Sequence, residues 1–224
     1  ALIIAEQLGR ALYPEPYSAS AVMATLALVH GDQTELTQAL LPRLAAGEII
    51  ASLAWQCERG GLDIEQCAVA VREHGGKRVL DGSSRFVAAP GADGFVVAVR
   101  AAGGLELYWI ARDADGLSCE LETLADGSAC ARLTFQGVDA TPGARVASAA
   151  TASAALQLAL DHATLAASAE LVGLMDCTLN MTLEYLRTRV QFGKPIGSFQ
   201  ALQHRAVDLY IQKELSRAAL DAAA

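Results

Sequence analysis

The sequence predicts an α+β protein of more than one domain, in which helices, then a β-rich segment, then helices again follow one another. Apolar residues recur at three- and four-residue steps before residue 47 and after residue 147, which is the spacing of one helical face. Between these segments the period shortens towards two, and Gly- and Asp-containing turns separate short apolar runs. We therefore expect helices over 1–47, a β domain over 48–146 and the start of a helical bundle over 147–224.

The first segment contains three expected helices. Apolar residues at helical spacing predict a helix over 1–12. A turn with two prolines follows, after which Ser18 or Ser20 could cap a second helix. A third helix is expected over 34–46, with leucines on one side and Gly47 as its stop.

Six short runs in the second segment are typical of strands: 69–72, 79–80, 95–99, 105–110, 117–121 and 131–135. Turn dipeptides such as Asp81-Gly82 and Asp126-Gly127 separate them. This density of turns predicts antiparallel hairpins in a compact β-sandwich or barrel. In the third segment a long apolar stripe predicts a helix, which is interrupted only around residues 193–197 and followed by another helix.

Composition and charge exclude several kinds of partner. Of 224 residues, 53% are apolar and 19% charged, which argues against a disordered chain. The net charge of −8 and a pI near 5.0 argue against nucleic acid and against an anionic membrane surface. Asp161 and Glu170 interrupt the longest Ala/Leu-rich stretch, so we expect no membrane span.

The cysteines and histidines predict no metal site. The five cysteines form no CxxC pair, and the four histidines form no HxxxH or HExxH motif. An odd number of unclustered cysteines is typical of reduced thiols packed as small apolar side chains. We therefore expect a cytoplasmic protein without a structural metal ion.

One segment, residues 185–200, contains side chains that suit ligand binding. It joins the end of a long helix, a Gly/Pro-bounded turn and the start of the next helix. Arg189 can bind a diphosphate through a two-pronged hydrogen bond, Gln191 and Gln200 offer amide groups, and Phe192 offers a flat apolar face. The helix start presents free N–H groups to an anion. Alternatively, Arg and Gln only tie a helical hairpin together, and Phe192 and Phe199 fill its core. The residues alone leave both interpretations open.

The same segment resembles a known signature. From Arg189 to Gln200 it matches the R-x-Q-F-G-x-P-I-x-x-F-Q pattern of acyl-CoA dehydrogenases. Residues 6–10 (EQLGR) are similar to the E-x-L-G-R near the end of that family's amino-terminal helical domain, and residues 47–54, 79–82 and 92–97 resemble its β-domain landmarks. The resemblance covers essentially the whole chain. Family members continue with further helices, so it implies a fragment that lacks both termini.

The resemblance implies a function. Family members use FAD to oxidise an acyl-CoA thioester to the 2-enoyl-CoA in fatty acid metabolism, and they pass the electrons to an electron-transfer flavoprotein. Carried over to this sequence, Arg189 and Gln200 hold FAD, with Gln191 and Phe192 as neighbours, commonly across a dimer interface. The implied assembly is a homodimer or homotetramer, or a heteromer with a homologous subunit.

The sequence also departs from the family pattern. The flavin-lining stretch is replaced by Trp55–Gly61, where Gln56 could substitute for the lost contacts, and the Trp/Thr flavin wall is replaced by residues 85–89. No catalytic base is visible, because an alternative family position falls near Ala163 and the usual one lies beyond Ala224. Asp161 and Glu170 are expected to be ordinary helix-face charges. These departures favour an alternative: a non-catalytic structural subunit of a heteromeric acyl-CoA dehydrogenase.

Overall fold

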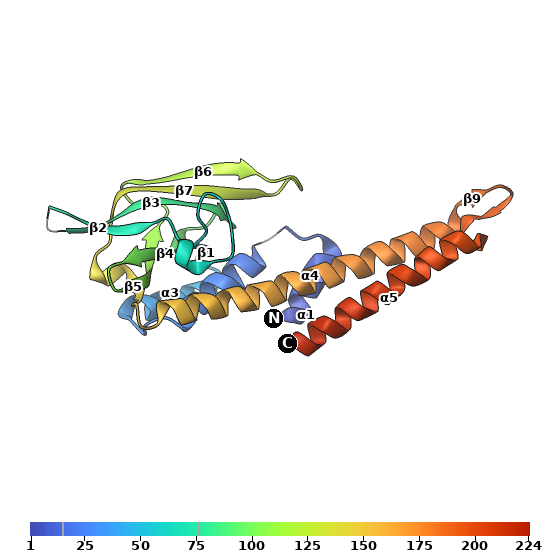
Figure 1. Cartoon of the computed structure of the whole chain (residues 1–224), viewed down its shortest axis with the longest axis horizontal. Coiled ribbons are helices and arrows are strands. Elements are labelled where there is room, and N and C mark those ends of the chain that lie inside the picture. The colour runs from blue at the N-terminus through green and yellow to red at the C-terminus, as the bar shows by residue number, and fades with distance from the viewer. Residues whose placement is uncertain (15, 76) are drawn as a thin grey trace. The chain divides into compact units, whose positions relative to one another are not determined.

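The chain folds into two compact units, of which the smaller one combines two segments that are distant in the sequence. The structure is a computed structural model that describes residues 1–14, 16–75 and 77–224. The smaller unit contains residues 1–14 and 164–224, and the larger one contains residues 15–163 (Figure 1). The predicted α+β class is confirmed, since helices precede and follow a mixed β-sheet. The three sequence segments, 1–47, 48–146 and 147–224, stay a prediction about domains.

The larger unit begins with a helix of unusual type. Residues Tyr17–Ala24 form a π-helix, η1, which continues into the short α-helix α2 (Thr25–Val29). The prediction that Ser18 or Ser20 caps this helix is wrong, because Pro16 is the N-cap residue and no side chain caps it. The hydroxyl oxygen of Ser20 instead accepts a hydrogen bond from the Ala51 N–H, at 3.3 Å. Ser20 therefore ties the helix to the first strand.

Helix α3 (Glu35–Ala45) begins and ends as the sequence predicts. At its start, the Thr34 side chain accepts a hydrogen bond from the Thr37 N–H at 3.1 Å, which satisfies one of the free donors of the first turn. At its end, Gly47 has a φ of +71°, a left-handed conformation that favours glycine. The Gly47 N–H donates to the Leu44 carbonyl and closes the last turn.

One sheet of eight strands forms the centre of the larger unit. Its strands are β1 (Ala51–Ala54), β2 (Ala70–His74), β3 (Lys77–Val87), β4 (Gly94–Ala101), β5 (Gly104–Ala111), β6 (Leu117–Thr123), β7 (Ala129–Asp139) and β8 (Arg145–Ala147). The order is β6-β7-β3-β2-β4-β5-β8, with β1 also paired to β4. The predicted hairpins β2–β3, β4–β5 and β6–β7 are present and antiparallel.

The sheet is mixed, although only antiparallel pairing is expected from the sequence. Strand β1 runs parallel to β4 over its whole length, and β2 makes one parallel bridge to β4. Short turn motifs in a sequence predict hairpins between neighbouring strands, whereas parallel pairs join strands that are distant in the chain. The parallel pairs therefore carry no local signal.

Strand β4 is buried on both faces and joins two apolar cores. Val96 and Ala98 point into a core shared with α2, α3 and the first turns of α4. The alternating residues Phe95, Val97 and Val99 point into a second core, formed with β3, β5 and β7. In Figure 1, α3 and the start of α4 lie along one side of the sheet. The helices and the strands are thus held together through β4.

The long helix α4 (Ala152–Thr188) is anchored by an acidic side chain from another segment. The Asp32 carboxylate accepts hydrogen bonds from the Ser148 N–H at 2.9 Å and from the Thr151 hydroxyl at 2.7 Å. Negative charge at a helix N-terminus is stabilising. Partial burial by itself would raise the pKa of Asp32, but the hydrogen bonds from Thr151 and Ser148 outweigh it and lower this pKa below its usual value.

Helix α4 also has the length and apolar composition of a membrane-spanning helix, the one such helix among the described residues. Its first turns have another explanation for this composition, since four of its residues belong to the core beneath the sheet: Ala152, Ala155, Leu156 and Ala159. Later along the helix, Asp176 forms ion pairs with two other helices. In the most apolar 18-residue stretch of this helix, 28% of the residues are buried.

The smaller unit contains α1 (Leu2–Ala11), the rest of α4 and α5 (Gln200–Ala223). Helix α1 approaches α4 closely at two glycines. A Cβ on Gly173 would lie 2.0 Å from the Glu6 carbonyl oxygen, and a Cβ on Gly9 would lie 2.0 Å from the Glu170 carbonyl oxygen. Real Cβ atoms do not tolerate such distances, so the crossing requires glycine at both positions.

Ion pairs fix the same crossing. Arg217 of α5 donates to both carboxylate oxygens of Glu6, at 2.6 and 3.0 Å. Asp176 of α4 forms ion pairs with Arg10 of α1 at 2.9 Å and with Lys213 of α5 at 3.3 Å. The EQLGR segment, residues 6–10, therefore has a packing role: its glutamate binds α5, its glycine contacts the α4 backbone, and its arginine binds α4.

Replacement of Gly173 by alanine tests the glycine crossing. At an open helical position this change stabilises a protein by up to about 1 kcal/mol. Here we expect a loss of about 1–3 kcal/mol in the free energy of unfolding, because the new methyl group meets the Glu6 carbonyl. Urea denaturation followed by circular dichroism measures the change. Gly143→Ala is the control, since nothing lies within 4 Å of its Cβ position. A more stable Gly173→Ala protein would contradict the crossing.

The Asp32 cap predicts a pH-dependent stability. Because the folded-state pKa of Asp32 lies below its unfolded value of about 3.9, its contribution is present above that pH and is lost as the pH falls through the folded pKa. We expect Asp32→Asn to cost about 1 kcal/mol at pH 7 and less near pH 2, because protonation removes the negative charge that stabilises the helix start. Denaturation at both pH values checks this, with exposed Asp113→Asn as the control. An equal loss at both values would show that the charge of Asp32 is irrelevant.

Candidate functional site

The candidate site is the hairpin that joins α4 to α5. Strands β9 (Val190–Gln191) and β10 (Lys194–Pro195) pair antiparallel, and the 3₁₀ turn η4 (Ile196–Ser198) leads into α5. The Arg189 N–H donates to the Tyr185 carbonyl at 2.9 Å, and the Ile196 N–H donates to the Arg189 carbonyl at 2.8 Å. The backbone of Arg189 is thus fixed on both sides, while its side chain is exposed.

The tip of the hairpin is a strained two-residue turn. Phe192 has a φ of 53° and Gly193 a φ of 79°, so both central residues are left-handed, as in a type I′ turn. Glycine adopts this conformation freely, but for a residue with a Cβ atom it costs about 1–2 kcal/mol. The Phe192 side chain is 89% exposed. The alternative interpretation, in which Phe192 and Phe199 fill the hairpin core, is therefore wrong for Phe192, whereas Phe199 is half-buried.

Contacts below the tip hold the hairpin in shape. The Phe192 ring meets the Phe199 ring edge to face, with centroids 6.0 Å apart. The Lys194 ammonium lies 4.5 Å from the Phe199 centroid, which is a cation–π contact. Phe199 is half-buried and forms the base on which the other two side chains rest. Phe192 consequently presents a fixed apolar surface to solvent.

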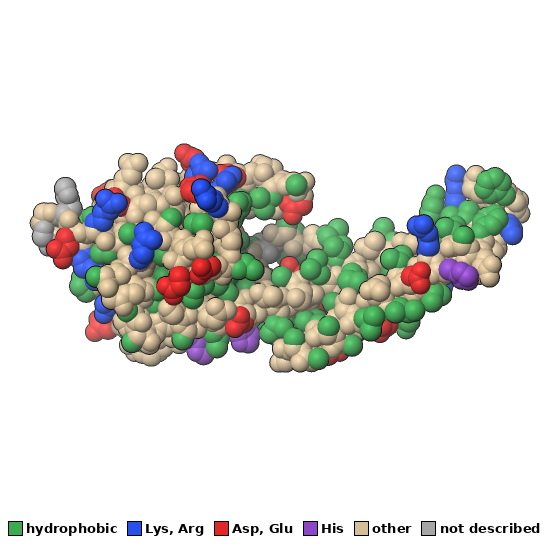
Figure 2. Space-filling view, viewed as in Figure 1, with side chains coloured by type: hydrophobic (Ala, Val, Ile, Leu, Met, Phe, Trp, Pro, Cys, Tyr) green, Lys and Arg blue, Asp and Glu red, His purple; other side chains and the backbone are tan. Residues whose placement is uncertain are grey.

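Four cationic side chains gather at this end of the unit: Arg187, Arg189, Lys194 and Arg205. In the part of the chain that the structure describes, none of the four forms an ion pair. Figure 2 shows Lys and Arg side chains next to apolar ones at the hairpin end. Arginines elsewhere hold carboxylates at close range, for example Arg217 with Glu6. The unpaired guanidinium of Arg189 therefore does not act as a tie within the hairpin.

The two glutamines of the signature lie on either side of this cluster. Gln200 is the first residue of α5, and the N-cap residue Phe199 provides no side-chain acceptor, so the positive end of the helix dipole is uncapped. Gln191 donates its Nε2 hydrogen to the Val190 carbonyl at 2.8 Å. Exposed arginines, an uncapped helix start and a free aromatic face suit an anionic ligand that also carries a flat ring.

The fifth predicted site residue, Gln56, belongs to the other compact unit. It follows β1, and its Nε2 hydrogen is donated to the Gly61 carbonyl at 3.0 Å. The hairpin brings together Arg189, Gln191, Phe192 and Gln200, whereas Gln56 lies in a turn of the β domain. The roles of all five residues stay predictions.

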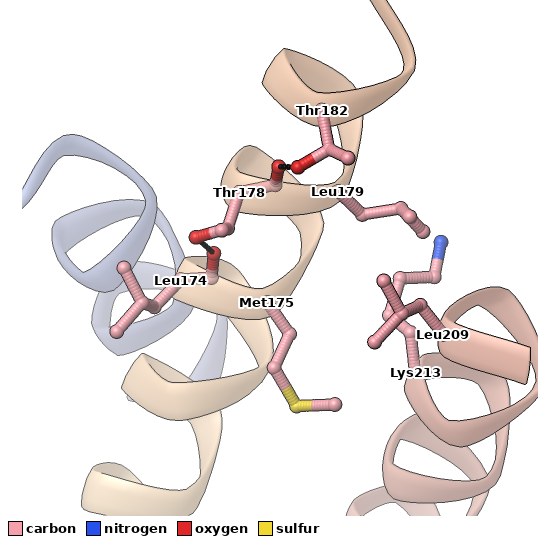
Figure 3. A pocket seen from close by; sticks show the side chains of 7 residues that line it. All are labelled: Leu174, Met175, Thr178, Leu179, Thr182, Leu209 and Lys213. Atoms are coloured by element: carbon pink, nitrogen blue, oxygen red, sulfur yellow. Dashed lines mark hydrogen bonds between the residues drawn. The ribbon is translucent and has the colours of Figure 1, made fainter. Parts of the chain in front are cut away.

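An apolar groove lies between α4 and α5 of the smaller unit. It has a volume of about 290 Å³ and is lined by Leu174, Met175, Thr178, Leu179, Thr182, Leu209 and Lys213 (Figure 3). The polar groups in its wall are engaged. The Thr178 and Thr182 hydroxyls donate to carbonyls one turn earlier, and the Lys213 ammonium binds Asp176 and Glu214. The groove therefore offers no polar group to a phosphate.

The β domain contains a buried ionic cluster that sequence patterns do not reveal. Glu106 accepts hydrogen bonds from Arg78 at 2.9 Å, from the Tyr108 hydroxyl at 2.7 Å and from Arg145 at 3.4 Å. Burial, together with the hydrogen bond to Glu106, raises the pKa of Tyr108 to about 12. Because every charge in the cluster is paired across β3, β5 and β8, its role is structural.

Among the described residues, no group of His, Cys, Asp and Glu side chains could hold a metal ion, and all five cysteines are free thiols. Asp161, one of the two carboxylates near the alternative family position of the base, is exposed and accepts a hydrogen bond from Gln157 at 2.8 Å. That contact is typical of a helix-face charge. The base itself stays unassigned.

Comparison with known proteins identifies the family. Residues 147–224 match the model of the acyl-CoA dehydrogenase C-terminal domain. Over 217 residues the chain is 30% identical to the acyl-CoA dehydrogenase FadE27 of Mycobacterium tuberculosis. This match covers 97% of this chain and 56% of FadE27. The chain belongs to the acyl-CoA dehydrogenase family, whose members are flavin-dependent oxidoreductases.

Solved structures agree with this assignment. The ChsE4-ChsE5 complex from Mycobacterium tuberculosis superposes with a TM-score of 0.85 at 28% identity, over 99% of this chain and 59% of that one. A structure of PigA with FAD and proline gives a TM-score of 0.88 at 25% identity, over 98% of this chain and 61% of that one. The chain thus spans a little over half the length of the relatives it matches.

Replacement of Phe192 by asparagine tests whether the left-handed conformation of Phe192 lowers the stability of the folded protein. Asparagine tolerates the left-handed conformation, so the free energy of unfolding is expected to stay unchanged or to rise by up to about 1 kcal/mol. Leu121→Asn, an exposed apolar residue in a strand, is the control and is expected to lose stability. Thermal denaturation compares the two. A marked loss in Phe192→Asn would mean that Phe192 is needed for folding.

Proposed function

We propose that this chain is part of an FAD-dependent acyl-CoA dehydrogenase, and that its α4–α5 hairpin binds the diphosphate of FAD. The proposed reaction is the oxidation of an acyl-CoA thioester to the 2-enoyl-CoA, with electrons passed to an electron-transfer flavoprotein. The observation that carries the proposal is the exposed guanidinium of Arg189, one of the four cations of the hairpin end, which forms no ion pair with any residue that the structure describes. Family membership and a neighbouring structure with FAD support it.

Each hairpin residue has a distinct part in the proposed site. Arg189 donates two hydrogen bonds to phosphate oxygens, and its fixed backbone limits the entropy lost on binding. Gln200 places its amide and the free N–H groups of α5 beside the same anion. Phe192 supplies a flat surface for a ring, and Gln191 an amide acceptor. When bound, FAD supplies the two-electron oxidation.

A second candidate is a non-catalytic subunit that pairs with an active homologue. The heteromeric ChsE4-ChsE5 complex among the structural neighbours supports this kind of assembly. Within the chain, the candidate is favoured by the turn after β1, whose Gln56 side chain is bound to Gly61. In either case the hairpin would bind FAD, commonly across a subunit interface.

Replacement of Arg189 by alanine tests the proposal. Loss of charge-assisted hydrogen bonds of about 1.5–3 kcal/mol predicts FAD binding weaker by about 10- to 100-fold. Absorbance near 450 nm of the purified full-length protein, before and after incubation with FAD, measures flavin occupancy. Arg43→Ala, which removes an exposed arginine from the other unit, is expected to retain the flavin. Equal occupancy in Arg189→Ala and wild-type protein would overturn the proposed site.

A further inference from the structure

The turn that follows β1 is closed by its own chain. Gln56 accepts two hydrogen bonds at its carbonyl, from the Ser84 hydroxyl at 2.9 Å and from the Arg85 N–H at 3.1 Å. Its side-chain Nε2 donates to Gly61, and the Gly60 N–H donates to the Cys57 carbonyl at 3.0 Å. Two donors of the turn, the Gln56 side chain and the Gly60 N–H, are therefore directed to the turn itself, and the Gln56 carbonyl is bound by two donors from the end of β3.

An aromatic ring covers the turn. Phe86, the last residue but one of β3, has a φ of 58°, and its ring carbon Cε2 lies 3.3 Å from the position that a Cβ on Gly60 would occupy. The Arg85 guanidinium stacks over the Phe86 ring at 4.8 Å. Three residues further on, Ala89 is also left-handed, with a φ of 53°. Non-glycine residues hold this conformation only where their surroundings enforce it.

A series of ion pairs also holds the turn after β1 in position. Arg85 donates to both carboxylate oxygens of Glu122, at 2.8 and 3.1 Å, and Arg132 binds Glu58 of the turn at 3.0 Å. The Arg132 Nε is buried and lies 3.5 Å from Glu122, an ion pair without a good hydrogen bond. The series Arg85–Glu122–Arg132–Glu58 thus joins β3, β6, β7 and the turn.

This closure does not suit a flavin ring. An isoalloxazine ring presents carbonyl oxygens and ring nitrogens that need hydrogen-bond donors, and a flat face that needs open apolar surface. Here the Gln56, Ser84 and Arg85 donors are already used within the chain. The ring that could offer an apolar face, Phe86, lies on Gly60 instead. Opening the turn would break this series of ion pairs and leave its charged side chains without partners.

We propose that the β domain of this chain does not hold the isoalloxazine ring, so that the chain binds FAD through its adenosine diphosphate half alone. The inference rests on the proposed function of the hairpin. It makes Gln56 a residue of the closed turn and not a flavin ligand. It also implies that any oxidation requires a β domain supplied by a different, homologous subunit.

The test compares three probes on the full-length protein by isothermal titration calorimetry: FAD, ADP and FMN. We expect FAD and ADP to bind with dissociation constants within about threefold of each other, and FMN not to bind, because only the diphosphate and adenosine are held. Bound FAD should keep the fluorescence of the free flavin ring. FAD binding about tenfold or more tighter than ADP, with quenched fluorescence, would overturn the inference while leaving the hairpin site intact.

Two variants separate this inference from the proposed function. Gln56→Ala is expected to leave the FAD and ADP affinities unchanged, whereas Arg189→Ala weakens both by about tenfold or more. A selective loss of FAD affinity in Gln56→Ala would show that the turn contacts the ring. If neither FAD nor ADP binds the wild-type protein, the hairpin proposal and the inference both fail.

Discussion

The burial of strand β4 on both faces is the constraint on which the larger unit depends. One set of its side chains enters the core beneath α2, α3 and α4, and the alternate set enters the core of the sheet. A polar residue at either set would remain unsatisfied, which explains the unbroken apolar run of residues 95–99. The start of α4 is packed against one of these cores and capped by Asp32. The later part of α4 is fixed separately, by the glycine crossing with α1 and the ion pairs to α5.

The α4–α5 hairpin and the turn after β1 thus have opposite electrostatic character. At the α4–α5 hairpin, cations are exposed and form no ion pair with the residues that the structure describes, and a strained turn keeps Phe192 in solvent. At the turn after β1, charges are paired in series and a strained Phe86 covers the backbone. The first arrangement is open to an anion, and the second is closed. A chain that binds a dinucleotide by one half only is the simplest account of this contrast.

Much of the fold could be predicted from local sequence patterns. Helical spacing located α1, α3, α4 and α5, the turn dipeptides located three hairpins, and the signature from Arg189 to Gln200 located the candidate site. The parallel pairing of β1 and β4, the π-helix and the Glu106 cluster were not predictable, because each depends on contacts between residues that are distant in sequence or on a backbone form without a residue signature. The closure of the Gln56 turn was not predictable for the same reason, since Arg85, Glu122 and Arg132 come from three strands.

A crystal structure of the full-length protein with FAD tests the central claim most directly. The account predicts that the diphosphate lies within hydrogen-bond distance of the Arg189 guanidinium, and that the turn from Trp55 to Gly61 keeps the closed form with Phe86 over Gly60. It further predicts that the isoalloxazine ring lies away from that turn. A ring bound against Gln56 of the same chain type, or a diphosphate held away from Arg189, would contradict it.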